Sequence, residues 1–194
     1  MSSSGWAPAA ATRRRFLQGS ALALGFVAAG GARIVATPAE ARARGLPLTV
    51  LDEAEAAALE VVVEALVPGA RQAGIAHFVD QQLGAAAEDN LLMLKYLGFD
   101  PAGHAGFYRE ALSNIERFSR AHFDSPAAGL APERAERLVA AMAGDDIPDW
   151  TGAPASLCHF ALRADGVDVV YGTAAGMTAL GMPAITHIEA PSPW

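Results

Sequence analysis

The stretch Asp168–Pro183, DVVYGTAAGMTALGMP, decides the fold class because it fits two different structures. An apolar run before a glycine-rich turn is typical of the strand, turn and helix start that bind a nucleotide phosphate. That turn needs the spacing Gly-x-Gly-x-x-Gly, and no two glycines of this chain are two positions apart. Gly-Lys-Ser/Thr does not occur, and the 18 residues after Gly176 are too few to complete a βαβ unit. The sequence therefore argues against a nucleotide site.

The residues upstream of this stretch indicate a helix. Pro154 and Ser156 suit a helix start. A strand at 167–171 would be isolated, because no segment with strand alternation accompanies it. Helical periodicity instead places one apolar stripe, which also carries Asp168, on residues Leu157, Phe160, Ala161, Ala164 and Tyr171.

Asp168 is the polar residue on this apolar stripe, and it has two interpretations. It is either a buried carboxylate that accepts hydrogen bonds from the amides of the Gly172-Thr173 turn, or a polar anchor to a partner. Gly172 is expected to cap the helix, and a short last helix is expected from Ala174 to Leu180.

The remainder of the chain has the same helical character. Asp52 and Glu55 form a capping box, after which Leu59, Val62, Val63 and Leu66 repeat with helical spacing. Further helices are predicted over residues 75–83, 91–97 and 103–122, and from Pro132 to about Met142. We therefore predict a single all-α domain of about six to seven helices, with long connections at 124–131 and 144–154 and an export signal before it.

The N-terminus fits a twin-arginine export signal. The defining residues are Arg13 and Arg14, followed by Phe16 and Leu17. The apolar run 19–32 follows them. Its 14 residues, at about 1.5 Å each in a helix, are too short to cross a hydrocarbon core of roughly 30 Å comfortably. The run is therefore interpreted as the apolar part of a signal peptide, and the protein is predicted to be periplasmic.

Two small-x-small triplets mark where this signal would be cleaved. Ala39-Glu40-Ala41 predicts cleavage near Ala41, Ala41-Arg42-Ala43 is an equal alternative, and retention of the signal is also open. The expected division is a twin-arginine signal peptide at 1–41 and a helical domain at 42–194.

Composition excludes several classes of function. With 194 residues, 52% of them hydrophobic, the chain suits one globular domain, and its formal charge of −7 offers no basic surface for nucleic acid. There is no Cys-x-x-Cys-His for haem, no cysteine set for an iron–sulfur cluster and no Gly-x-Ser-x-Gly nucleophile turn. Asp145, Asp146 and Asp149 are interpreted as a solvated loop. The histidines lack metal-site spacing and are scattered at His77, His104, His122, His159 and His187.

Cys158 is the single cysteine, and two roles are open for it. A lone cysteine in an apolar context is most often a small core residue. In an exported chain without a second cysteine, the thiol is alternatively available for a disulfide to another subunit.

Two segments carry a resemblance to a known family. ALRADGVDVVYGT at 161–173, followed by LGMP at 180–183 and a closing Pro193-Trp194, resembles the C-terminal signature of the gluconate 2-dehydrogenase subunit 3 family. LVPGA at 66–70, with AGI at 73–75 and FVD at 78–80, is similar to the first block of that family. The resemblance covers most of the chain after the leader, although 88–149 adds little to it.

This resemblance implies a non-catalytic small subunit of a periplasmic dehydrogenase complex for sugars, sugar acids or other alcohols. FAD would lie in a large flavoprotein subunit of the glucose-methanol-choline oxidoreductase type, and haem c in a cytochrome c subunit. This chain would bind no cofactor, would carry the folded flavoprotein through the twin-arginine route, and would stabilise it. Association with the cytoplasmic membrane would be indirect, through the complex. The alternative is an independent exported helical binding protein.

The apolar C-terminal residues are the candidate surface for the flavoprotein, with packing in the core of this chain as the alternative. These residues are Tyr171, Met177, Leu180, Met182, Pro183 and Trp194.

Overall fold

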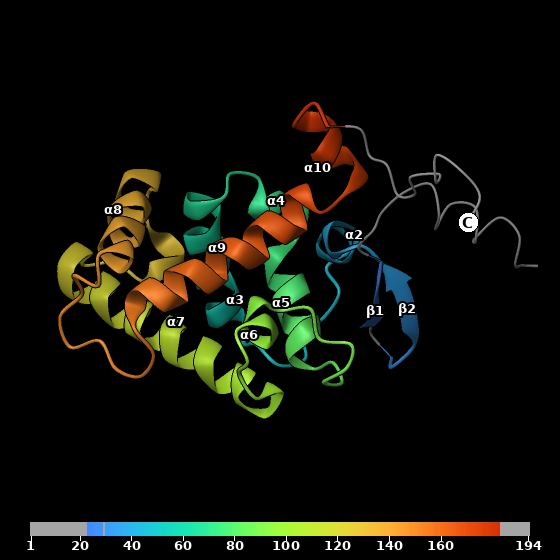
Figure 1. Ribbon diagram of the computed structural model, residues 1–194, viewed down its shortest axis with the longest axis horizontal. Coiled ribbons are helices and arrows are strands. Elements are labelled where there is room, and N and C mark those ends of the chain that lie inside the picture. Colours follow the sequence, from blue (N-terminus) through green and yellow to red (C-terminus); the bar gives the residue numbers. More distant parts are fainter. Residues whose placement is uncertain (1–22, 29, 183–194) are drawn as a thin grey trace, which may run out of the picture.

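The computed structural model describes residues 23–28 and 30–182 as a body of helices with a small β-hairpin at one end (Figure 1). The leader residues Arg13, Arg14, Phe16 and Leu17 and the candidate interface residues Pro183 and Trp194 lie outside the described residues. In chain order the elements are β1 Leu24–Val27, β2 Arg33–Ala36, α2 Pro38–Ala43, α3 Glu53–Leu66, α4 Ala70–Ala73, α5 Ile75–Leu83, α6 Met93–Tyr96, α7 Pro101–Phe123, the 3-10 helix η1 Ala127–Gly129, α8 Pro132–Ala143, α9 Ala155–Tyr171 and α10 Ala174–Ala179.

The all-α prediction is confirmed, since the hairpin is the one sheet in the described part of the chain. The two short helices α2 and α4 add to the expected set. The long connections near 124–131 and 144–154 are present, and the first of them contains η1.

Helix α3 lies at the centre of the body, packed against α5, α7, α8 and α9 (Figure 1). Its predicted capping box is present: the Glu55 amide donates to Asp52 at 2.8 Å, and the Asp52 amide donates to Glu55 at 2.9 Å. Val62 and Val63 are fully buried. The box satisfies two N-terminal amides, so residues three positions apart stabilise the first turn.

Helix α9 meets α3 at Gly166, where side chains from α3 and its C-terminal cap pack directly on the backbone of α9. A Cβ atom at Gly166 would lie 2.6 Å from Cγ1 of Val63 and 3.1 Å from Cγ2 of Val67. Glycine is therefore needed here for packing. The backbone of residue 166 is ordinary helix, so its conformation does not call for glycine.

Helix α6 is shorter than the predicted helix at 91–97. The amide of Leu91 donates to the side chain of Gln82 at 2.6 Å, and that of Leu92 to the side chain of Asn90 at 3.0 Å. Because these side chains hold the backbone before Met93 in an extended conformation, helix starts only there.

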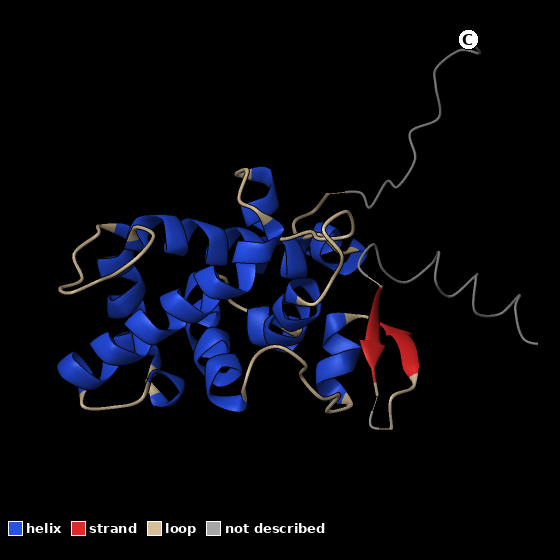
Figure 2. Ribbon diagram, turned by 90° about the horizontal axis from the view of Figure 1, so that it is seen from below, coloured by secondary structure: helices blue, strands red, loops and turns tan. Residues whose placement is uncertain are grey.

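A hairpin occupies part of the apolar run 19–32, where a helical signal segment was expected. Strands β1 and β2 pair antiparallel, with Leu24 opposite Ala36 and Val27 opposite Arg33. Gly30 and Gly31 have φ of 94° and 81°, which favours a turn over a continuous helix. The hairpin stands at the edge of the helical body (Figure 2). In the described ranges, none of the helices has the length and apolar character needed to cross a membrane.

Candidate functional site

Helix α9 buries a face different from the stripe that periodicity suggested. Asp165 is fully buried, whereas Asp168 is exposed. The prediction of a buried Asp168 carboxylate is therefore wrong: the bond that links it to Gly172 runs from the Gly172 amide to the Asp168 main-chain carbonyl, at 2.9 Å. Gly172 does cap the helix as expected. The buried face consists of Ala155, Cys158, Ala161, Leu162, Asp165, Gly166 and Val169.

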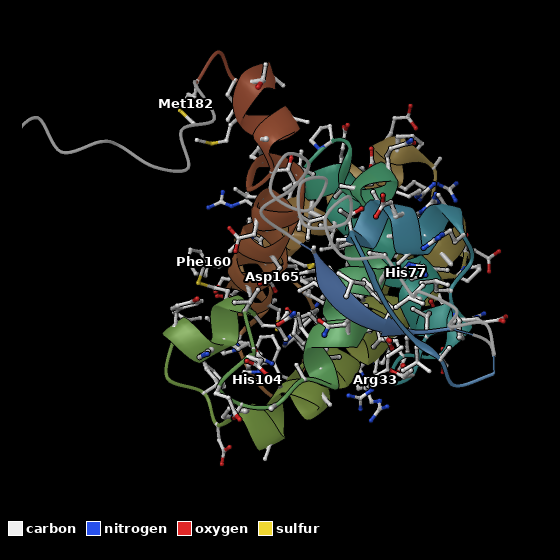
Figure 3. All side chains as sticks on the ribbon, turned by 90° about the vertical axis from the view of Figure 1, so that its right-hand side faces the viewer. Arg33, His77, His104, Phe160, Asp165 and Met182 are labelled. Carbon is white, nitrogen blue, oxygen red and sulfur yellow. The ribbon has the colours of Figure 1, made fainter. Side chains whose placement is uncertain are left out.

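Asp165 joins three helices inside the body (Figure 3). The Tyr108 hydroxyl of α7 donates to Oδ2 of Asp165, and the Met93 amide of α6 donates to Oδ1 at 2.8 Å. Burial raises the pKa of Asp165 to about 7, against the lowering effect of these two hydrogen bonds. Burial, with the neighbouring Asp165 charge, also raises the pKa of Tyr108 well above its ordinary value.

The Tyr108–Asp165 pair has no access to solvent, since both residues have an exposed fraction of 0%. A perturbed carboxyl pKa often marks a catalytic acid or base, but such a group must reach its substrate. The arrangement is suited to fixing α6 and α7 against α9, and it pairs the Tyr108 hydroxyl and both Asp165 oxygens.

The opposite face of α9 exposes two large apolar side chains beside the charged Arg163 and Asp168. Phe160 and Val167 are each 40% exposed, and Ala164 and Tyr171, at helical spacing between and beyond them, are half-buried. Large apolar side chains on the solvent side of a helix, rimmed by charged ones, are typical of a contact surface.

Apolar residues of two neighbouring elements extend this face. Helix α6 and the turn after it contact α9 on one side, and α10 contacts the end of α9 on the other (Figure 1). We call the combined exposed residues the α9 surface. Its members are Tyr96, Leu97, Phe99, Phe160, Val167, Leu180 and Met182. Phe160 and Met182 project from the same side of the molecule (Figure 3).

The predicted partner residues fall partly on the α9 surface. Leu180 and Met182 are 52% and 44% exposed. Tyr171 and Met177 are half-buried, and Tyr171 packs against the core. The predicted partner residues did not include Tyr96, Phe160 or Val167. The apolar stripe that contains Phe160 was the available signal for that residue.

A cavity of about 430 Å³ lies between the hairpin and α5, lined in part by Arg33, Thr49 and Asp80. The Asp80 carboxylate accepts the main-chain amides of Thr49, Val50 and Leu51 at 2.7–3.0 Å. Asp80 thus holds the loop before α3, and its oxygens are committed to that role.

The histidines do not come together, and three of them bond to nearby main-chain carbonyls. His77 lies 3.0 Å from the oxygen of Leu46, and His104 and His122 make similar contacts within α7 or at its start. His187 lies outside the described residues. Across residues 23–28 and 30–182, no group of three or more His, Cys, Asp or Glu side chains is placed to hold a metal ion.

The carboxylate of Asp145 in the acidic loop has a structural role. Both oxygens of Asp145 accept hydrogen bonds from Ser156, one from its amide at 2.7 Å and one from its hydroxyl at 2.6 Å. These bonds lower the pKa of Asp145 below its usual range. Asp145 therefore ties the loop to the first turn of α9.

Cys158 lies on the buried face of α9, with an exposed fraction of 2%. Its Sγ is 3.9 Å from the main-chain oxygen of Ala153. Burial raises the pKa of the Cys158 thiol to about 12, so the thiolate is disfavoured. These facts favour the core interpretation, and the disulfide to another subunit stays a prediction.

Comparison with known proteins gives one match. The family profile described as "Gluconate 2-dehydrogenase subunit 3" matches residues 53–182, which include α3 to α10 and the whole α9 surface. Searches of curated proteins and of solved structures give no match. The match covers well over half of the sequence, and the chain therefore belongs to the gluconate 2-dehydrogenase subunit 3 family.

Proposed function

We propose that this chain is the non-catalytic small subunit of a periplasmic FAD-dependent dehydrogenase that oxidises a sugar, sugar acid or other alcohol. It carries the folded flavoprotein through the twin-arginine route and stabilises it by covering part of its surface. The family membership supports a place in a dehydrogenase complex. The leader supports the role of carrier, and the α9 surface supports the role of stabilising the flavoprotein.

The observation that carries the proposal is the set of large apolar side chains that the chain exposes on α9 and on the elements that contact it. One face of α9 packs on α3 and α8, and the other exposes Phe160 and Val167, while Tyr96 is exposed on α6, which contacts α9. Exposed aromatic and large aliphatic residues are typical of a protein interface. A subunit of a stable complex has a permanent partner to cover such a surface. The flavoprotein is the partner we assign to it.

The chemistry of substrate oxidation is assigned to the partners. FAD belongs to a flavoprotein of the glucose-methanol-choline oxidoreductase type, and haem c belongs to a cytochrome c subunit. The buried carboxyl of Asp165 and the committed carboxylate of Asp80 support a structural role for this chain, because neither is free to bind a substrate.

The leader supplies the export part of the proposal. Arg13 and Arg14 with Phe16 and Leu17 form the twin-arginine pattern, and this route carries folded proteins. A flavoprotein that lacks a leader would cross the membrane, with FAD already bound, as the cargo of this chain. The small subunit would then stay bound to it in the periplasm and reach the membrane through the cytochrome c subunit.

The substitution Val167→Glu tests the assigned interface. A glutamate at this position would place a charge in an apolar contact, so the affinity for the flavoprotein should fall at least about tenfold. The measurement is the amount of flavoprotein retained by the tagged chain in a pull-down. Thermal unfolding of the free variant checks that α9 still folds.

Ala140→Glu is the matched control. Ala140 is an exposed apolar residue in the last turn of α8, which is not one of the elements that form the α9 surface. This variant should retain the flavoprotein as the wild type does. Equal retention by both variants would remove the α9 surface from the interface. A wild-type chain that retains no flavoprotein would instead favour an independent binding protein.

A further inference from the structure

We propose that α2 remains in the mature protein and that the leader is cut after Ala32, in the exposed turn between β1 and β2. The proposal rests on the export proposed above, and it moves the processing site away from α2. Both triplets that the sequence suggested, 39–41 and 41–43, lie inside α2.

Helix α2 is folded locally by a capping box of its own. The Glu40 amide donates to the Thr37 hydroxyl at 3.1 Å, and the Thr37 amide donates to the Glu40 carboxylate at 2.9 Å. Pro38 stands in the first turn, where its fixed φ favours helix. A protease binds its substrate as an extended strand, so cleavage after Ala41 would require this helix to unwind.

Helix α2 is also docked on the helical body. Ala41 has an exposed fraction of 0%, and Arg42 forms an ion pair with Glu60 of α3 at 3.0 Å. Its backbone rests on Gly74, between α4 and α5. A Cβ atom at Gly74 would lie 2.8 Å from the Ala39 nitrogen and closer still to the carbonyl of Pro38. Only a glycine at position 74 leaves room for the backbone of α2, so this contact is part of the packing of the folded domain.

The residues that follow α2 are also attached to the helical body. His77 of α5 lies 3.0 Å from the main-chain oxygen of Leu46, three residues beyond the end of α2. Removal of residues 1–41 would expose the faces of α4 and α5 that α2 covers. The segment from Thr37 to Leu46 therefore belongs to the folded domain, although it precedes the family match at residue 53.

The turn between β1 and β2 is more accessible than α2, and cleavage there would release β1 with Phe26 while α2 stays on the helical body. Gly30, Gly31 and Ala32 are exposed, and they form a small-x-small triplet that directly precedes Arg33. Exposed turns of small residues are the preferred sites of proteolytic cleavage. The triplet also ends the apolar run 19–32, where a signal peptide is expected to be cut.

The intact mass of the chain purified from the periplasm tests the proposal directly. The expected N-terminus is Arg33. An N-terminus at Arg42 or Arg44, which means cleavage inside α2, would overturn the proposal, and so would an uncut chain.

Two alanine variants identify the triplet that the protease reads. Ala32 and Ala39 are both exposed, and each occupies a small-residue position of one triplet. Ala32→Leu should leave the chain uncut, whereas Ala39→Leu should leave processing unchanged. The reverse pattern would assign cleavage to α2.

Two glycine variants of the full chain test the docking of α2 without export. Gly69 and Gly74 both have left-handed backbones, with φ of 93° and 85°, but a Cβ atom at Gly69 would meet nothing within 4 Å. Gly74→Ala should therefore lower the melting temperature about 5 °C more than Gly69→Ala. Equal shifts would show that α2 is not docked. A chain that never leaves the cytoplasm would contradict the export proposal alone, and these variants would still decide whether α2 belongs to the folded domain.

Discussion

At the scale of single residues, the buried carboxyl of Asp165 couples the stability of the helical body to pH. The pKa of Asp165 is about 7 in the folded chain and about 3.9 in an unfolded one. Between these values the folded state binds more protons than the unfolded state. The protonated Asp165 carboxyl therefore contributes its full stabilisation below about pH 4, and this contribution is lost as the pH rises through about 7.

The variant Asp165→Asn isolates this effect because it cannot titrate. The free energy of unfolding of the wild type, minus that of the variant, should be larger at pH 5 than at pH 8. The slope approaches about 1.4 kcal/mol per pH unit between the two pKa values. Urea unfolding of both proteins at both pH values measures it. A difference that does not change with pH would contradict the buried, protonated Asp165.

The thiol of Cys158 is predicted to be unreactive in the folded chain. It is 2% exposed, and burial raises its pKa to about 12, so both access and thiolate content are low. Titration with a chromogenic thiol reagent should give a slow reaction in buffer and a fast one in urea. Fast reaction in buffer would instead place the thiol at the surface, where a disulfide to another subunit could form.

At the scale of elements, the crossing of α9 and α3 depends on the missing side chain of Gly166. Gly166→Ala should lower the free energy of unfolding by about 1–3 kcal/mol, because the added methyl group would overlap Val63. Gly106→Ala in α7 is the control, since a Cβ atom there would meet nothing within 4 Å. It should raise stability by about 0.5–1 kcal/mol through helix propensity. Urea unfolding compares the two, and a stabilising Gly166→Ala would refute the close crossing.

Elements defined by neighbouring residues could be predicted from the sequence, and α3 shows why. Its start depends on Asp52 and Glu55, which are three residues apart, so the local sequence is sufficient to predict where the helix begins. Helix α6 begins later than predicted because the Leu92 amide bonds to Asn90 and the Leu91 amide bonds to Gln82, nine residues earlier. Helical periodicity contains neither hydrogen bond.

The faces of α9 could not be assigned for a related reason. Periodicity identifies the buried side of a helix only when polar residues are confined to the other side, and α9 has a carboxyl on each side, Asp165 buried and Asp168 exposed. The predicted stripe runs between the two faces, because its Ala161 is buried whereas its Phe160 is exposed. The hairpin was missed because its residues were assigned to the leader.

At the scale of the whole molecule, the leader is predicted to direct the export of two proteins, this chain and the flavoprotein. Replacing Arg13 and Arg14 together by Lys should retain both this chain and its flavoprotein in the cytoplasm, since the flavoprotein travels as cargo. Arg15→Lys is the control, because the twin-arginine pattern accepts any residue at that position. Cell fractionation followed by detection of both proteins is the measurement. A fully loaded flavoprotein in the periplasm of the double variant would contradict the carrier role.

The most direct test of the central claim is purification of the tagged chain from the periplasm of cells that express it naturally. The account predicts that a larger protein co-purifies with it and that the preparation has the absorption spectrum of a bound flavin. The flavin should follow the larger protein when the two are separated. A colourless preparation that contains this chain alone would contradict the claim that it is the small subunit of a flavoprotein dehydrogenase.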